Sequence, residues 1–324
     1  MAKVKSVIGC EVTTNEIRAV EITKNDGVYS ILAMGTMPLE EGVVEEGFIR
    51  DADRFSTAIA TLLAEGNFQT TDVAISVNNE NLLMRYAAFP KVDSDKLRNM
   101  VLLQAQEFIP IPIQEMEIDY VVAGETPADG DEPPQTNVML IAARRQMLEG
   151  YINIFTASRL QVIDIDSALL SYCRGINQIC EGKKYAIVNL TDDVLNFIVV
   201  HGNEISMVRS ITIPERNQKH VMSIFKGSKD ASYTDEDIEA VTSFLTSETS
   251  SSISYYQMQN SAPVEKLYFI ANSSAVPQIL PTLKENLYLD MEVPQFYPTL
   301  QASTAADLGE YASCIGVAIS GLEG

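Results

Sequence analysis

Two short polar turns are the places in this sequence where binding chemistry is most readily placed. The first, Thr13-Thr14-Asn15-Glu16, joins two β-rich runs within residues 7–22. The second, Thr191-Asp192-Asp193, joins two similar runs within residues 185–200. Backbone N–H groups in turns of this kind can approach a phosphate closely. Two hairpins of the same build predict a duplicated, two-lobed protein whose turns face each other across a cleft.

Other catalytic patterns are absent from the sequence. It holds no H-E-x-x-H, G-x-S-x-G, G-x-x-x-x-G-K-[ST] or G-x-G-x-x-G motif. The four cysteines form no C-x-x-C pair, and only His201 and His220 could complete a zinc site. Scattered cysteines within apolar runs indicate buried thiols in a reducing compartment. We therefore expect no catalytic residue and no metal centre.

Composition excludes several classes of function. The chain has 324 residues, with 44 acidic and 23 basic side chains and a net charge of −21. Such an acidic chain lacks the basic face that nucleic acid requires, so no nucleic-acid partner is expected. No stretch approaches the roughly 18–20 apolar residues of a transmembrane helix, and residues 1–12 do not resemble a secretory signal. We expect a cytoplasmic protein that reaches a membrane only through a partner.

The elements that position the two turns follow from hydrophobic periodicity and from glycine and proline positions. The predicted strands span residues 7–12, 17–22, 29–36, 72–77, 82–89, 117–123, 137–143, 161–165, 185–190, 194–200, 205–213, 266–271 and 295–297. The predicted helices span residues 51–64, 94–108, 146–158, 167–179 and 305–322, with a long helix starting at 234–237 and a short one after residue 274. Residues 214–233 are predicted to be irregular, and Pro277 and Pro281 are expected in or before the first turn of the short helix.

Each half of the chain therefore reads strand, strand, strand, helix, strand, helix, which is the order expected of the actin-type fold. Within the first half, the segments Glu107-Phe108-Ile109-Pro110, Pro112-Ile113-Gln114-Glu115 and Ile118-Asp119-Tyr120 follow one another. They resemble the helix-to-strand signature of the type IV pilus assembly protein PilM family. Residues 37–49 and 138–144 resemble two further elements of that family, and the similarity runs in order over nearly the whole chain. The cytoplasmic part of the type II secretion protein GspL is related and is the competing assignment.

The resemblance implies an α/β fold of the actin-like, duplicated ribonuclease H-like type, with two lobes and an FtsA-type α+β insert. The expected first subdomain comprises residues 1–78 and 165–184, with the helix at 305–322 packed on the actin-like core. The insert is expected at residues 79–164. The expected second lobe comprises residues 185–213 and 262–304, with a small subdomain at 214–261.

The resemblance also implies a function. PilM-like proteins are scaffolds on the cytoplasmic side of the inner membrane that hold the short tail of the bitopic protein PilN. They form rings between the membrane platform protein and the motor ATPases. By resemblance, the peptide groove lies between the first subdomain and the insert. The residues predicted to lie beside it are Arg85, Phe89, Gln104, Glu107, Phe108, Ile109 and Pro110. For Phe108 and Ile109, plain core packing is the alternative.

The family's nucleotide loops are altered in this sequence. Where the family pattern is Ile-Gly-x-Asp-Ile-Gly-Ser-Ser-x-x-Lys, this chain has Glu11 for the aspartate, Thr13 for the second glycine and Arg18 for the lysine. The second loop, Val-Asp-x-Gly in the family, reads Val188-Asn189-Leu190-Thr191. The loop that holds adenosine carries glycines in the family and here reads Ala271-Asn272-Ser273-Ser274. Bulkier side chains thus stand wherever bare backbone should meet the nucleotide.

We interpret this cleft as a degenerate nucleotide site that does not hydrolyse ATP, because fold alone does not carry function. Its residues are Glu11, Thr13, Thr14, Asn15, Arg18, Asn189, Thr191, Asp192, Asn272, Ser273 and Ser274. No cofactor is expected. Two alternatives stay open: weak binding of ATP and magnesium in a cleft that is still polar, and an active actin-like ATPase whose assembly is gated by nucleotide.

Overall fold

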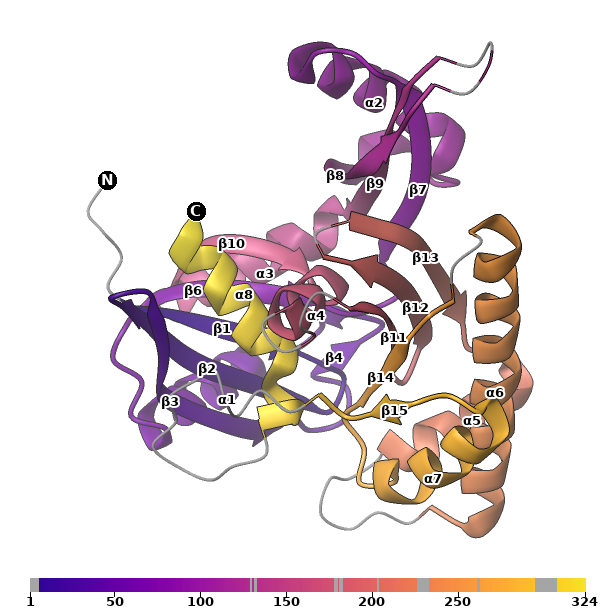
Figure 1. Cartoon of the computed structure of the whole chain (residues 1–324). Coiled ribbons are helices and arrows are strands. Elements are labelled where there is room, and N and C mark those ends of the chain that lie inside the picture. Colours follow the sequence, from indigo (N-terminus) through magenta and orange to yellow (C-terminus); the bar gives the residue numbers. More distant parts are fainter. Residues whose placement is uncertain are drawn as a thin grey trace.

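Two five-stranded sheets of identical topology form the framework (Figure 1). The structure, a computed structural model, describes residues 6–128, 130, 133–177, 180, 183–202, 204–225, 233–260, 263–294 and 308–324. The first sheet has the order β10-β6-β1-β2-β3 and the second has the order β13-β12-β11-β14-β15. When the second order is reversed, β15, β14, β11, β12 and β13 correspond in turn to β10, β6, β1, β2 and β3. The predicted duplication is therefore confirmed.

Each sheet starts with the predicted hairpin. The first sheet contains β1 (Ser6–Val12), β2 (Glu16–Asn25), β3 (Val28–Pro38), β6 (Asp72–Val77) and β10 (Gln161–Ser167). The second contains β11 (Lys184–Leu190), β12 (Val194–His201), β13 (Glu204–Thr212), β14 (Lys266–Ala271) and β15 (Met291–Glu292). In both sheets the first two strands pair antiparallel, and the first strand pairs parallel with the fourth.

Alternate residues of each strand face opposite helical layers, because side chains in a strand point in turn to its two faces. In β1, Ile8 and Cys10 pack under α1 (Ala52–Glu65) and α3 (Arg145–Ala157). The second sheet is covered by α5 (Glu215–Phe225), α6 (Asp235–Gln259) and α7 (Val276–Leu287). A minor hairpin of β4 (Val44–Glu45) and β5 (Phe48–Ile49) borders α3.

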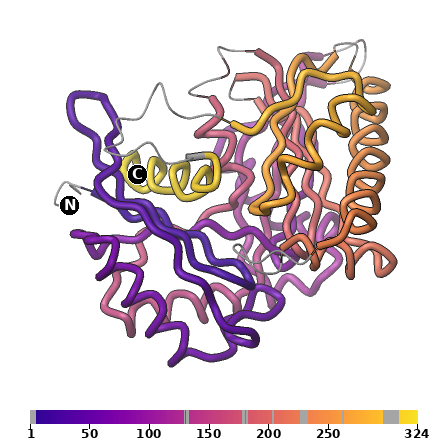
Figure 2. The backbone as a smooth tube through the Cα atoms, turned by 90° about the horizontal axis from the view of Figure 1, so that it is seen from below, coloured from indigo at the N-terminus to yellow at the C-terminus, as the bar shows by residue number. Residues whose placement is uncertain are grey.

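Two helices, α4 (Ala168–Asn177) and α8 (Ala312–Glu323), lie between the sheets and share one apolar core with both lobes (Figures 1 and 2). Two glycines allow this close packing. A Cβ on Gly9 would lie 1.8 Å from the Cys314 carbonyl oxygen, and one on Gly316 would lie 2.0 Å from that of Ser171. Because both obstacles are backbone atoms, neither could move aside. Gly9, which the sequence pattern associates with nucleotide binding, is thus required here by the packing of α8.

The insert is a three-stranded sheet, β7-β9-β8, covered on one face by a helix. It consists of β7 (Leu82–Pro90), α2 (Ser94–Phe108), the short turn η1 (Ile113–Glu115), β8 (Met116–Thr126) and β9 (Gln135–Arg144). Its other face packs against β13 of the second lobe, where Met84 and Met139 meet Ile205 in one core. The insert therefore contacts both lobes.

Several predicted boundaries need correction. Residues 145–164, expected in the insert, form α3 and most of β10, and β10 pairs parallel with β6 in the first sheet. Residues 214–233 are not irregular throughout, since α5 forms there and buries Val221 and Ile224 against α6. Few of its residues are apolar, so this segment resembles a polar loop in overall composition although its apolar residues lie on one face.

Two further corrections concern the C-terminal part. Pro281 lies inside α7, beyond its first turn, where buried Ile279 and Leu283 on either side hold the helix to the second sheet. Helix α8 begins at Ala312 rather than 305 and follows the short turn η2 (Leu308–Tyr311). The strand predicted at 295–297 lies outside the described residues.

Candidate functional site

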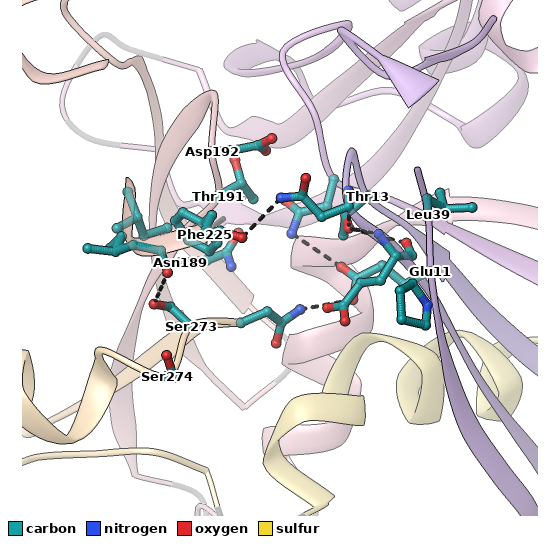
Figure 3. Close-up of a pocket in the computed structure, with 16 residues that line it drawn as sticks. Glu11, Thr13, Leu39, Asn189, Thr191, Asp192, Phe225, Ser273 and Ser274 are labelled. Carbon is teal, nitrogen blue, oxygen red and sulfur yellow. Dashed lines mark hydrogen bonds between the residues drawn. The ribbon is translucent and has the colours of Figure 1, made fainter. Parts of the chain in front are cut away.

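The two hairpin turns line a cavity of about 180 Å³ between the lobes, where side chains from both sides converge (Figure 3). Nine of the eleven predicted cleft residues line it, and Thr14 and Arg18 do not. The lining residues that sequence reasoning missed are Glu16, Pro38, Leu39, Asn78, Leu190, Ile224 and Phe225. Asn78 follows β6 directly, and the carboxyl ends of parallel strands are where ligand sites form in such sheets. That rule could have identified it.

The two turns are built alike, because a threonine hydroxyl caps each one. In the first, the amides of Glu16 and Asn15 donate to Thr13 Oγ1 at 3.2 and 3.4 Å. In the second, those of Val194 and Asp193 donate to Thr191 Oγ1 at 3.0 and 3.4 Å. Two N–H groups of each turn that could approach a phosphate are therefore already used within the turn.

A buried ionic cluster lies at the base of the first turn. Glu11 and Arg18 are directly opposite each other on β1 and β2, and both are almost fully buried. Arg18 Nη1 lies 3.7 Å from Glu11 Oε2, and Arg18 Nη2 forms an ion pair with Glu16. One guanidinium thus serves two carboxylates, and its Nε and Nη1 atoms make no hydrogen bond to any described residue.

Glu11 is also a centre of weaker contacts from three other elements. Asn78 Nδ2 donates to its Oε1 at 3.4 Å, and the Tyr172 hydroxyl does so at 3.5 Å. Asn272 Nδ2 of the second lobe donates to Oε2 at 3.5 Å. Burial, and then the negative charge of Glu11, raises the pKa of the Tyr172 hydroxyl well above its usual range, so Tyr172 is a neutral donor.

Each turn also reaches across the cleft to the opposite lobe. The Asn15 side chain donates to the carbonyl of Phe225 at 3.1 Å, and the amide of Glu80 donates to Asp193 Oδ2 at 3.0 Å. Asn15 and Asp193 occupy equivalent positions, two residues after Thr13 and Thr191. Burial raises the pKa of the Asp193 carboxyl to about 6. These two hydrogen bonds, Asn15 to Phe225 and Glu80 to Asp193, form an interlobe clasp in which each turn is bonded to the opposite lobe.

The remaining predicted cleft residues are engaged with neighbouring backbone. Asn189 Nδ2 donates to the carbonyl of Ile270 at 3.3 Å, while its buried Oδ1 accepts nothing from a described residue. Ser273 Oγ donates to the carbonyl of Ile224 at 2.6 Å. The segment 272–274 is thus bonded to the end of α5.

The residues predicted to bind a peptide are divided between core and surface. Phe89 and Ile109 are buried, and the Phe89 and Phe108 rings pack with their centroids 5.9 Å apart. The Arg85 guanidinium donates to the carbonyl of Met84 at 2.9 Å. Gln104, Glu107 and Pro110 are exposed at the end of α2.

A second cavity of about 310 Å³ lies between the insert and the first lobe. None of the seven predicted peptide residues lines it; its lining is Leu82, Arg98, Glu117, Ile118, Asp119, Ile141, Ala143, Leu148, Ile165, Asp166 and Ser167. Three of these are acids and one is basic. Asp166 forms an ion pair with Arg174, but burial still raises the pKa of its carboxyl. Strand β8 runs along this cavity as the edge strand of its sheet in the described part of the chain.

Among the described residues, no cluster of three or more His, Cys, Asp and Glu side chains is placed to hold a metal ion. The four cysteines are free and buried. None of the described helices is both long and apolar enough to cross a membrane.

The duplicated sheets, the turns facing each other and the helices packed between the lobes define a two-lobed protein of the actin-like fold class. A sequence model of the type IV pilus assembly protein PilM family matches residues 9–216. The chain therefore belongs to the PilM family, as the sequence resemblance predicts.

Three solved structures are similar to this chain to different degrees, and the two with TM-scores above 0.5 agree on the fold. A chain in the PilM-PilN type IV pilus biogenesis complex matches with a TM-score of 0.84 at 19% identity, covering 99% of this chain and 100% of that chain. The ethanolamine utilization protein EutJ from Carboxydothermus hydrogenoformans matches with a TM-score of 0.52 at 10% identity, covering 97% and 89%. The cytoplasmic domain of EpsL, from the type II secretion system of Vibrio cholerae, matches with a TM-score of 0.46 at 10% identity, covering 87% and 94%.

Proposed function

We propose that this protein is a non-enzymatic scaffold of type IV pilus assembly that binds the tail peptide of a PilN-like bitopic membrane protein. Family membership and the likeness to a chain of the PilM-PilN complex support the partner. Through that partner the scaffold would sit at the cytoplasmic face of the inner membrane. There it would assemble into a ring that links the platform protein to the motor ATPases.

The observation that carries the peptide site is the cavity beside the free edge of β8. An edge strand presents unpaired N–H and C=O groups, and an extended peptide can add to it as a further strand. The cavity next to this edge is large enough for one or two side chains of the peptide. Its acids, Glu117, Asp119 and Asp166, favour a peptide that carries a basic residue.

The test is fluorescence anisotropy with a labelled peptide from the cytoplasmic tail of the bitopic protein encoded beside this one. Asp119→Lys reverses a charge in the β8 cavity, whereas Glu107→Lys makes the same change at the end of α2. Both positions are exposed, so neither variant should disturb folding. We expect Asp119→Lys to weaken binding about tenfold or more and Glu107→Lys to leave it unchanged. The reverse result would place the peptide at the α2 residues predicted from sequence, and no binding by the wild type would contradict the proposal.

We further propose that the interlobe cleft is a degenerate nucleotide site. Three features support this: its volume is small beside the roughly 300–1,000 Å³ of ordinary ligand pockets, its turn amides are capped by Thr13 and Thr191, and Arg18 already neutralises Glu11. The residues present therefore do not fit ATP with magnesium. Isothermal titration with Mg-ATP and Mg-ADP is expected to show no micromolar binding, and a malachite-green assay is expected to show no phosphate release.

The alternative is an active ATPase, and one observation favours it. Glu11 keeps a carboxylate in the cleft, within reach of the amide side chains of Asn78 and Asn272. Micromolar affinity for Mg-ATP together with phosphate release, both lost in Glu11→Gln, would establish this alternative. Because nucleotide and tail peptide are assayed separately, either proposal can fail without the other.

A further inference from the structure

A broad hollow lies between α6 and α7 on the second lobe and shares no lining residue with either cavity described above. Its volume is about 660 Å³, larger than either of them. Its lining is Asp235, Ile238, Glu239, Thr242, Ser243, Thr246, Ser247, Thr282 and Asn286. Helix α6 forms the outer edge of the lobe (Figures 1 and 2).

The lining has a regular geometry. Residues four apart on a helix lie on the same face, so Glu239, Ser243 and Ser247 form one exposed row along α6. A second row, Thr242 and Thr246, lies deeper beside it, and Thr282 and Asn286 form the facing row on α7. Packed helices lie about 8–10 Å apart, measured between their axes. Small side chains on both walls let the backbone of another helix approach to such a distance.

A buried polar group in this hollow lacks a partner. Thr242 is 4% exposed, and its hydroxyl makes no hydrogen bond to any described residue. The neighbouring hydroxyl of Thr246 is already used, because it donates to the Thr242 carbonyl at 2.8 Å and accepts from Asn286 at 3.4 Å. A buried hydroxyl without a partner is costly, so any group that reaches the Thr242 hydroxyl in a docked complex would stabilise that complex.

The charge of the hollow is one-sided. The 25 residues of α6 include five acids and no lysine or arginine. Two of those acids, Asp235 and Glu239, lie at the end of the hollow where α6 begins. Neither has an ion-pair partner among the described residues.

We propose that this hollow docks a basic helix of a partner protein, lying along α6 and α7 with its lysine or arginine side chains toward Asp235 and Glu239. The small-residue walls set the close approach, and the two acids set the charge and direction of the helix. Only Ile238 is apolar in the lining, so the contact is polar and sensitive to salt. It would leave the β8 cavity free, so the scaffold could hold two partners at once.

The test uses a fluorescein-labelled alanine–lysine helical peptide of about 15 residues and the same peptide with glutamate in place of lysine. Binding to the full chain is followed by anisotropy, and the site is located by hydrogen exchange. The site variant Glu239→Gln/Ser243→Lys is matched by Glu65→Gln/Ala64→Lys, which makes the same charge change on exposed residues of α1. A third variant, Ser247→Trp, fills the hollow without changing charge.

We expect the lysine peptide to protect α6 and α7 from exchange and the glutamate peptide not to bind. The site variant and Ser247→Trp should each weaken binding about tenfold, and the α1 variant should change it less than about twofold. Equal weakening by the two charge variants would mean that the peptide responds only to net charge, and would overturn the proposal. Protection confined to other elements, or no binding of the lysine peptide, would overturn it as well.

Discussion

The two hairpin turns are copies in backbone but not in charge. Glu11 and Arg18 face each other across the first hairpin, and Asn189 and Asn196 face each other at the equivalent positions of the second. All four side chains are buried. The same backbone thus holds an ion pair in one lobe and two neutral amides in the other. The fold therefore does not require buried charge at these positions. The ionic cluster is either what remains of a ligand site or a feature that stabilises the first lobe alone.

The largest effect is expected from breaking the cluster. Arg18→Ala leaves Glu11 and Glu16 buried without their cation, and losing one partner of a buried ion pair costs about 3–5 kcal/mol of unfolding free energy. Asn196→Ala, the same change in the second lobe, removes only a neutral amide and should cost about 1–2 kcal/mol. Urea unfolding of the two variants measures the difference. Equal costs would show that the cluster is no more than a polar contact.

The two side chains of the interlobe clasp also differ in charge, because Asn15 is neutral and Asp193 ionises with a pKa of about 6. The ordinary Asp pKa is about 3.9, so the folded state holds the proton more tightly than the unfolded state. The Asp193 carboxyl therefore contributes fully to the free energy of unfolding below about pH 4. This contribution, about 2–3 kcal/mol, is lost as the pH rises through 6. We expect Asp193→Asn to remove this loss while keeping an acceptor for the Glu80 amide.

The check is urea unfolding of wild type and Asp193→Asn at pH values between about 4 and 7, compared as a difference so that other groups cancel. Asn15→Asp supplies the mirror experiment. It places a carboxylate against the Phe225 carbonyl, so it should lower stability as pH rises. A difference between wild type and Asp193→Asn that does not change with pH would contradict the assignment.

Both turns have a threonine cap, so removing the cap should lower stability in a similar way in each turn. Thr13→Val and Thr191→Val keep the shape but leave two turn amides without an acceptor, which should cost about 1–2 kcal/mol each. The Thr191 hydroxyl also bonds Asp193 at 2.6 Å, so Thr191→Val should be the costlier. Thermal unfolding of both, with Thr14→Val as the uncapped control, measures this ranking; a larger loss in Thr13→Val would reverse it.

Sequence reasoning located the strands and the facing turns well, because alternating apolar residues and polar turns are local signals. It could not locate contacts made by distant segments. The Asn15–Phe225 bond depends on α5, which sequence reasoning missed because few of its residues are apolar. The role of Gly9 depends on a helix that begins some 300 residues later. The insert boundary was wrong for a similar reason, since the pairing of β10 with β6 is a long-range choice. The β8 cavity forms where six helices and strands meet, and no local pattern marks it.

The smallest effect is expected from making the first turn a copy of the second. The triple variant Glu11→Asn, Glu16→Val, Arg18→Asn transfers the residues found at 189, 194 and 196. It removes all three buried charges together, so no ion is left unpaired, and replacing a buried ionic group by neutral residues is often neutral or stabilising. Stability should therefore lie within about 1 kcal/mol of wild type, well above that of Arg18→Ala, when measured by urea unfolding. If the triple variant is as unstable as Arg18→Ala, the first lobe has come to depend on its charges, and the two hairpins are equivalent in backbone alone.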